Sequence, residues 1–301
     1  MEVRVPALDD PGQVARLFWT CYEPVHAVTY FHPRARAAYE AAGLRGYWRG
    51  YFAGRAAPLG PVGPAPVLAA FFTFAPHMVS RALPAVWQLA GPEQALRARL
   101  TGAVQGLAEL TYELPERHLA EAAELIEAAA GAVGVAYGRV LGAANAALPR
   151  GDYPLARLWQ SATTLREHRG DGHVAALVAA DLDPVETLAW RVASGMPAQN
   201  LLGRGWSEQE WTRARDRLAA RGWLTTRPHL PAAESPGTPT EHGRAAFRAI
   251  EETTDNAAAR PWQALAPESR RRLHTLLTPV AHAAHRVIPA ENPIGLPTPQ
   301  S

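Results

Sequence analysis

Apolar residues recur every three or four positions along most of the chain, a spacing that predicts helices rather than strands. The first such stretch follows Asp10-Pro11, a capping residue with a proline in the first helical turn. It continues through Leu17, Phe18 and Tyr22. The pattern therefore predicts a mainly α-helical chain from its first ordered segment onward.

Two stretches of the N-terminal half leave their structure or purpose open. Residues 46–55, GYWRGYFAGR, place Gly46, Gly50 and Gly54 four apart, beside a stripe of two tyrosines and an arginine. Glycine destabilises a helix by about 1 kcal/mol relative to alanine, so three in register indicate close packing or binding. Residues 67–74, VLAAFFTF, are compatible with either a strand or a buried helix.

The second half changes to short helices with clear start signals. Asp183-Pro184 starts one helix, and Ser207 with Glu210 has the form of a capping box for the next. WLTTR then has strand composition, a proline-rich loop follows, and Thr240 caps another helix. This is the order of a winged helix-turn-helix, in which a small β wing follows the recognition helix.

We therefore predict an N-terminal helical bundle followed by a winged helix-turn-helix with a two-stranded wing. The expected divisions are 1–150 for a ligand-binding helical domain, 151–260 for the winged helix-turn-helix, and 261–301 for a C-terminal helix and loose tail.

Composition narrows the class of protein. All 30 basic residues are arginine, against 28 acids, and residues 151–260 hold 13 Arg and 14 Asp or Glu, a net charge of −1. A domain that neutralises many phosphates is normally clearly positive. The single cysteine allows no internal disulfide, and the histidine spacing indicates no metal site and no cofactor.

No signal peptide or membrane span is expected, which predicts a cytoplasmic protein. The most apolar segment, 128–149, is rich in Ala and Gly and is interrupted by Arg139, so we expect a core helix there.

The segments ARDRLAARGWLTTR and TPTEHGRAAFRAIEETTD resemble the winged-helix region of MarR-type regulators. With YFHP, GLRGYWRGYFAGRAAPLG and LREHRGDGHVAAL, the whole chain is similar to an actinobacterial family labelled helix-turn-helix or SalK-like. The resemblance implies a regulator of transcription and no settled chemistry.

A DNA interface is expected on the helix after Ser207. Its candidate contacts are Arg213, Arg217 and Arg221 on the solvent face, with Arg204 before the helix and Arg227 at the wing. Double-stranded DNA and a homodimer that reads a palindrome are the expected partners. The alternative is that neighbouring acids neutralise these arginines.

The segment LREHRGDGH, 165–173, gathers unusual charge beside apolar helical sequence. A continuous helix would place Arg166, Arg169 and His173 on one side. Alternatively, the helix breaks at Gly170 and Asp171 caps a second one. In that case the second helix runs over 173–180.

We expect this segment to meet the N-terminal half at a polar pocket that suits a small acidic or carbonyl-bearing aromatic ligand. The candidate ligand-binding residues are His26, Tyr30, His32, Tyr47, Tyr51, Arg55, His77, Arg81, Arg166, Arg169, Asp171 and His173. The competing interpretation is a buried arginine–acid network that ties the two halves together.

The sequence leaves two alternative functions. The first is a ligand-responsive winged-helix DNA-binding regulator. The second is a ligand-binding protein or enzyme that keeps the fold without reading DNA, with His77 or His173 as base, Tyr47 or Tyr51 as acid, and arginines holding a carboxylate or oxyanion. DNA binding depends on whether the arginines of the recognition helix are free, and the enzyme on whether both histidines reach one cavity.

Overall fold

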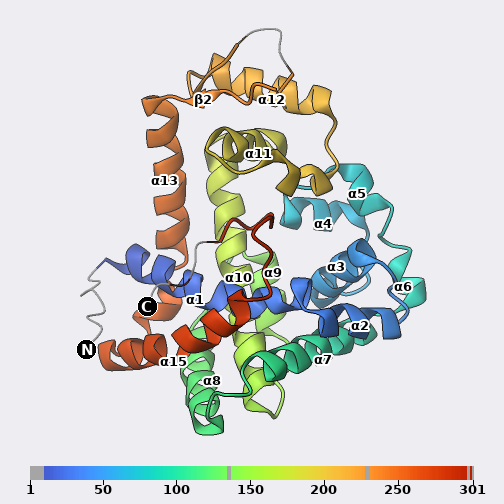
Figure 1. The fold of residues 1–301 in the computed structure, drawn as a ribbon, viewed down its shortest axis with the longest axis vertical. Coiled ribbons are helices and arrows are strands. Elements are labelled where there is room, and N and C mark those ends of the chain that lie inside the picture. The colour runs from blue at the N-terminus through green and yellow to red at the C-terminus, as the bar shows by residue number, and fades with distance from the viewer. Residues whose placement is uncertain (1–9, 134–136, 228–230, 233, 297–298, 300–301) are drawn as a thin grey trace.

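The computed structural model describes residues 10–133, 137–227, 231–232, 234–296 and 299. Within them the fold is mainly α-helical with a two-stranded antiparallel sheet, as the sequence predicts (Figure 1). The first half contains α1 (Pro11–Phe31), α2 (Pro33–Ala41), α3 (Tyr47–Ala56), η1 (Ala57–Leu59), α4 (Pro64–Phe71), α5 (Pro76–Ser80), α6 (Val86–Leu89), α7 (Pro92–Leu110), α8 (Glu116–Gly131) and α9 (Val140–Ala146). The second half contains α10 (Pro154–Ala179), α11 (Pro184–Ala193), η2 (Ala198–Asn200), η3 (Leu202–Arg204), α12 (Glu208–Ala220), β1 (Leu224–Thr225), β2 (Thr238–Pro239), α13 (Glu241–Ala257), α14 (Arg260–Gln263) and α15 (Pro267–His285).

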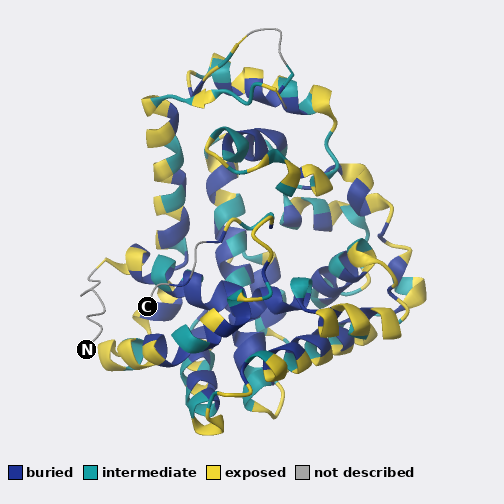
Figure 2. Ribbon diagram, in the orientation of Figure 1, coloured by how far each residue is buried: buried dark blue, intermediate teal, exposed yellow. Residues whose placement is uncertain are grey.

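Helix α10 runs without interruption through the charged segment, so the predicted break at Gly170 is wrong. Two glycines in its middle cost about 1 kcal/mol each. Packing offsets this cost, because α10 contacts α1, α7, α8, α9 and α13. Figure 2 shows α1 and α10 crossing as largely buried helices at the centre of the molecule. The continuous helix puts the charged side chains in the interior.

Two hydrophobic cores meet along α10. Its first half supplies Leu158, Trp159 and Leu165 to a core shared with α1, α7, α8 and α15. Its last turns supply Ala176 and Leu177 to the core of the winged-helix region. The predicted division after residue 150 stays a prediction, and α10 links the cores on either side.

The winged-helix region follows its predicted local signals. Ser207 and Glu210 form a reciprocal capping box at the start of α12, and Thr240 accepts the N–H of Gly243 at the start of α13. The strands pair Leu224 with Pro239 and Thr225 with Thr238. The loop between them includes residues 228–230 and 233, which lie outside the described residues. In Figure 1, α12 and the wing form the top of the molecule, above α11.

The glycine stripe of α3 accommodates an aromatic side chain. A Cβ on Gly54 would lie 2.0 Å from the Tyr39 hydroxyl oxygen, and one on Gly50 would lie 3.0 Å from the Tyr39 ring. Gly46 precedes the helix with a φ of 89°. The stripe therefore brings α2 against α3 and fixes the face on which the α3 tyrosines and Arg55 lie.

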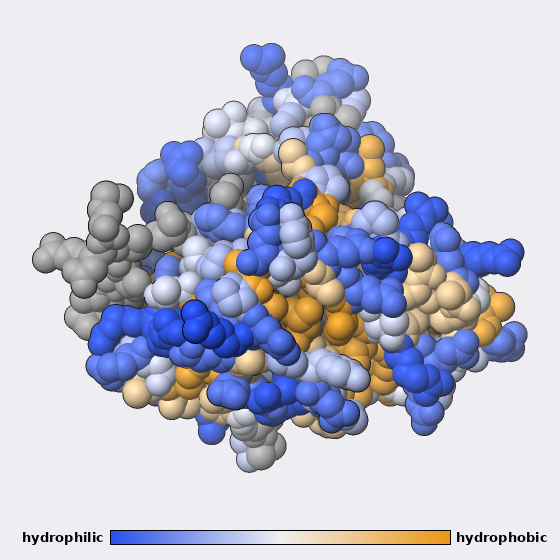
Figure 3. All heavy atoms as spheres, turned by 60° about the horizontal axis from the view of Figure 1, so that its bottom comes forward, coloured by the Kyte–Doolittle hydropathy of each residue, from blue (hydrophilic) through white to orange (hydrophobic). Residues whose placement is uncertain are grey.

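Two other segments take a definite form. Residues 67–71 of the ambiguous apolar run are helical, as the end of α4. Residues 128–149 do not form the single core helix that we expected, because α8 ends at Gly131 and α9 begins at Val140. None of the helices in the described part of the chain is long and apolar enough to cross a membrane. The face that is lowest in Figure 1 carries hydrophilic side chains at its edges and hydrophobic ones near its centre (Figure 3).

Candidate ligand cavity and DNA interface

A cavity of about 290 Å³ lies between the N-terminal bundle and the winged-helix region. We call it the central cavity. Helices α1, α3, α10, α11 and α13 contribute to its wall, together with the end of α4, η3 and the C-terminal residues Pro293 and Ile294. A wider surface pocket of about 720 Å³, the outer pocket, shares Arg191, Phe247 and Glu251 with it.

The wall formed by α1, α3 and α10 holds arginines that are paired with acids. Arg55 donates two hydrogen bonds to Glu167, at 2.9 and 3.0 Å, and Arg166 donates to the same carboxylate at 2.8 Å. Arg166 also lies 3.5 Å from Glu23. Burial opposes ionisation of Glu167, but Arg166 and Arg55 outweigh it and hold its pKa well below the usual range. These charges are neutralised inside the protein.

A second paired group joins α10 to α13 and α1. Arg169 lies 2.6 Å from Asp255, and Arg16 reaches Asp255 at 2.6 Å and Glu251 at 2.5 Å. His173 hydrogen-bonds Thr254 at 3.0 Å. Burial lowers the pKa of His173, which favours its neutral form. This network fixes α13 against the bundle.

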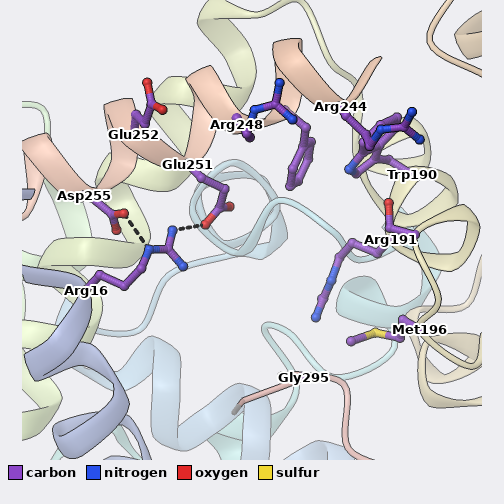
Figure 4. A pocket seen from close by; sticks show the side chains of 12 residues that line it. Arg16, Trp190, Arg191, Met196, Arg244, Arg248, Glu251, Glu252, Asp255 and Gly295 are labelled. Atoms are coloured by element: carbon purple, nitrogen blue, oxygen red, sulfur yellow. Dashed lines mark hydrogen bonds and ion pairs between the residues drawn. The ribbon is translucent and has the colours of Figure 1, made fainter. Parts of the chain in front are cut away.

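The wall formed by the winged-helix region is different. Arg191 of α11 and Arg204 of η3 form no ion pair with any acid among the described residues. Arg191 donates to the Ile294 carbonyl at 2.7 Å, and the Arg204 guanidinium lies 4.1 Å from the centre of the Phe74 ring. Figure 4, a view of the outer pocket, shows Arg191 extending into that pocket, while Arg16 is engaged by Glu251 and Asp255.

Tyr51 lies where the two walls meet. Its hydroxyl accepts a hydrogen bond from Arg55 at 3.2 Å. Burial opposes ionisation of the phenol, but the positive charges of Arg55, Arg204 and Arg166 outweigh burial and lower its pKa. The Tyr51 hydroxyl therefore lies in electropositive surroundings.

Five of the twelve predicted ligand residues line the central cavity: Tyr51, Arg55, Arg166, Arg169 and His173. Three more lie behind or beside them. His26 hydrogen-bonds Tyr30 at 2.9 Å, and the Tyr30 ring lies 5.2 Å from that of Tyr51. Tyr30, Tyr47 and Tyr51 line a separate small pocket.

The other four predicted residues lie elsewhere. His32 caps α2 and lies 3.6 Å from Glu109, and Asp171 accepts the N–H of Gly142 at 2.8 Å on the side of α10 that faces α9. His77 and Arg81 are exposed at α5, so His77 does not share the central cavity with His173.

Sequence reasoning missed Arg191 and assigned Arg204 to DNA. Arg204 cannot serve there, since its side chain turns inward against Phe74 and Tyr51. Both positions look like ordinary helix-end arginines, and no sequence signal tells which arginines lack an acid in the fold.

The candidate DNA face of α12 is largely neutralised. Arg217 pairs with Asp183 and, at 3.0 Å, with Glu186, and Arg221 pairs with Asp181 at 2.7 Å. Arg213 and Arg227 are exposed, and the structure gives neither an ion pair within the described residues. Two of the three arginines expected as a free stripe are thus held by acids at the start of α11 and in the turn before it.

The described residues contain no group of three or more His, Cys, Asp or Glu side chains that could hold a metal ion. No curated protein and no solved structure matches the chain significantly. A family model described as a helix-turn-helix family matches residues 15–289. The match carries no MarR-like or SalK-like assignment. It spans most of the chain, bundle and winged-helix region together, and the protein therefore belongs to a helix-turn-helix family.

Proposed function

We propose that this protein is a ligand-responsive DNA-binding regulator with a MarR-like winged helix-turn-helix that acts as a homodimer. The observation that carries the proposal is the position of the central cavity. It is walled on one side by the bundle and on the other by α11 and α13, the helices that flank the recognition helix α12 in the chain. Family membership supports the DNA-binding part of the proposal.

A ligand in this cavity contacts both parts of the molecule at once. Any difference in its affinity for two arrangements of α11 against α10 shifts the population toward the arrangement that it binds better. Because α12 packs directly on α11, such a shift changes the presentation of α12 to DNA. This is the physical basis of the proposed response.

Fewer arginines are available to contact DNA than the sequence indicates. Arg213 on α12 and Arg227 at the wing are the exposed arginines available for phosphates or base edges, whereas Arg217 and Arg221 already have acidic partners. We therefore expect modest affinity for random DNA and greater dependence on specific base contacts.

The test is a salt titration of binding to duplex DNA of random sequence. Wild type is compared with Arg213→Ala and Arg227→Ala, and Arg97→Ala on α7 is the control, since that side chain is 70% exposed but far from α12 in the chain. Removal of an arginine that binds one phosphate should reduce the slope of log K against log salt by about 0.9. An absence of binding at low salt, or an equal change in the control, would contradict the proposal.

The homodimer is tested separately by light scattering of the purified chain. The proposal expects a mass of twice 32.5 kDa and loss of cooperative DNA binding when the protein is diluted to its monomer. A monomer at every concentration that binds DNA would contradict the dimer and leave DNA binding intact.

A further inference from the structure

The charges around the central cavity do not balance. Two acids, Glu23 and Glu251, line it, and Glu167 and Asp255 pair with its arginines. Each of the four is already engaged: Glu23 and Glu167 by Arg55 and Arg166, Glu251 and Asp255 by Arg16 and Arg169. Arg191 and Arg204 also line the cavity, and neither forms an ion pair within the part of the chain that the structure describes. The cavity therefore carries two positive charges that form no ion pair with a carboxylate among the described residues, and the charge of Glu251 offsets that of Arg191 only in part.

Keeping these two guanidiniums together is unfavourable for the protein alone. Burial and the nearby charge of Arg204 lower the pKa of Arg191 to about 10, and burial lowers that of Arg204 as well. Like charges in a partly desolvated space repel, and an uncompensated buried charge is destabilising. A fold that retains such a pair commonly does so for function.

Apolar surface surrounds the two arginines. Phe71 belongs to a core of the bundle, Phe72 and Phe247 pack against the core of the winged-helix region, and Ile294 and Tyr51 also line the cavity. At about 30 Å³ per water molecule, 290 Å³ holds about ten waters. The space suits a molecule of one or two rings rather than a nucleotide or a peptide.

We propose that the central cavity binds a small aromatic carboxylic acid, with its carboxylate between Arg191 and Arg204 and its ring against Phe71, Phe72 and Phe247. The inference rests on the proposed sensor function, because it names the ligand class of that cavity. Planar guanidiniums match a planar carboxylate and donate two hydrogen bonds to it. The ligand's carboxylate replaces the Ile294 carbonyl as an acceptor for Arg191, so binding also alters the contact of the C-terminal segment.

The site is divided between the two halves of the molecule in a specific way. The arginines of α3 and α10 are held by ion pairs on the bundle side of the cavity. The carboxylate of the ligand binds instead to residues of α11 and η3. The ligand's carboxylate is thus held by α11 and by the residue that ends η3, whose side chain also packs on Phe74 of the bundle.

The test measures the binding of benzoate, phthalate, benzamide and inorganic phosphate by calorimetry, in the absence of DNA. Benzoate or phthalate should bind, benzamide should bind at least about tenfold more weakly for want of a charge, and phosphate should not bind. Arg191→Gln and Arg204→Gln should each weaken carboxylate binding about tenfold or more. The exposed Arg81→Gln is the control and should bind as wild type does.

Arg191→Lys keeps the charge without the planar fork, and it should recover only part of the affinity. Equal binding of benzamide and benzoate, binding of phosphate alone, wild-type affinity in both glutamine variants, or no binding of any probe would overturn the proposal. Carboxylate binding without DNA binding would retain this inference and reject the regulator, and DNA binding without carboxylate binding would do the reverse.

Discussion

Both sides of the central cavity carry arginines, but those on the bundle side form ion pairs and those on the winged-helix side do not, within the described residues. On the bundle side, Arg55 and Arg166 share Glu167 in a buried network. On the winged-helix side, Arg191 and Arg204 form no ion pair among the described residues and make contact with a carbonyl and an aromatic ring. Burial alone does not separate the two groups, because both line one cavity.

This difference between the two sides bears on how the charged segment 165–173 is interpreted. The sequence left two alternatives, a ligand pocket and a structural network, for a single set of arginines. In the fold, the arginines of α3 and α10 belong to a network, and the cavity arginines that form no ion pair among the described residues come from α11 and η3. The network alternative therefore describes the arginines of α3 and α10, and the ligand pocket stays a prediction.

The largest expected effect is a loss of stability when the ion pairs on the bundle side of the cavity are broken. Glu167→Gln removes the acid shared by Arg55 and Arg166 and leaves two buried cations facing each other. Breaking a buried pair from one side costs about 3–5 kcal/mol, so we expect a loss of this size in the free energy of unfolding, measured in urea.

The control for this prediction is Glu109→Gln, which removes an acid from a half-exposed pair with Arg34. That change should cost at most about 1 kcal/mol. Equal losses in the two variants would remove the distinction between the buried network and ordinary surface pairs.

A second prediction contrasts two acids on one helix. Asp171 lies one turn after Glu167 but faces α9, and burial raises its pKa to about 6 from 3.8. The unfolded chain therefore releases this proton at lower pH than the folded protein, and stability falls as pH rises from about 4 to about 6. Asp171→Asn can retain the hydrogen bond from Gly142.

We expect Asp171→Asn to be more stable than wild type above about pH 6, by at most about 3 kcal/mol, with no advantage below about pH 4. Urea denaturation across this range measures the difference. An advantage that does not depend on pH would show that the ionisation of Asp171 is not its cause.

Local signals predicted the fold class and many helix starts. Asp10, Asp183, Ser207 and Thr240 each cap the helix that the sequence assigns to them, because a cap depends on the few residues around it. The break at Gly170 was wrong because packing on five other helices outweighs two glycines.

The site was only partly predictable for the same reason. Five residues of the predicted set reach the central cavity, since Arg166, Arg169 and His173 share one face of α10 whatever surrounds them. The inward turn of Arg204 and the lack of an ion pair for Arg191 within the described residues depend on tertiary contacts between segments far apart in the chain. Spacing within one helix contains no information about these contacts.

The smallest expected effect concerns Arg191, on the winged-helix side of the cavity. Here we expect a substitution to increase stability rather than reduce it. Arg191→Gln removes a cation that Arg204 repels, and a glutamine amide can still donate to the Ile294 carbonyl. We expect the free energy of unfolding to rise by up to about 1 kcal/mol, as is common when a group kept for function is removed. The matched control is Arg55→Gln, which leaves Glu167 with Arg166 alone and should destabilise the protein. A cation that is kept for a ligand does not stabilise the protein without that ligand. If Arg191→Gln lowered the free energy of unfolding as much as Arg55→Gln does, both groups of arginines would serve only to stabilise the fold.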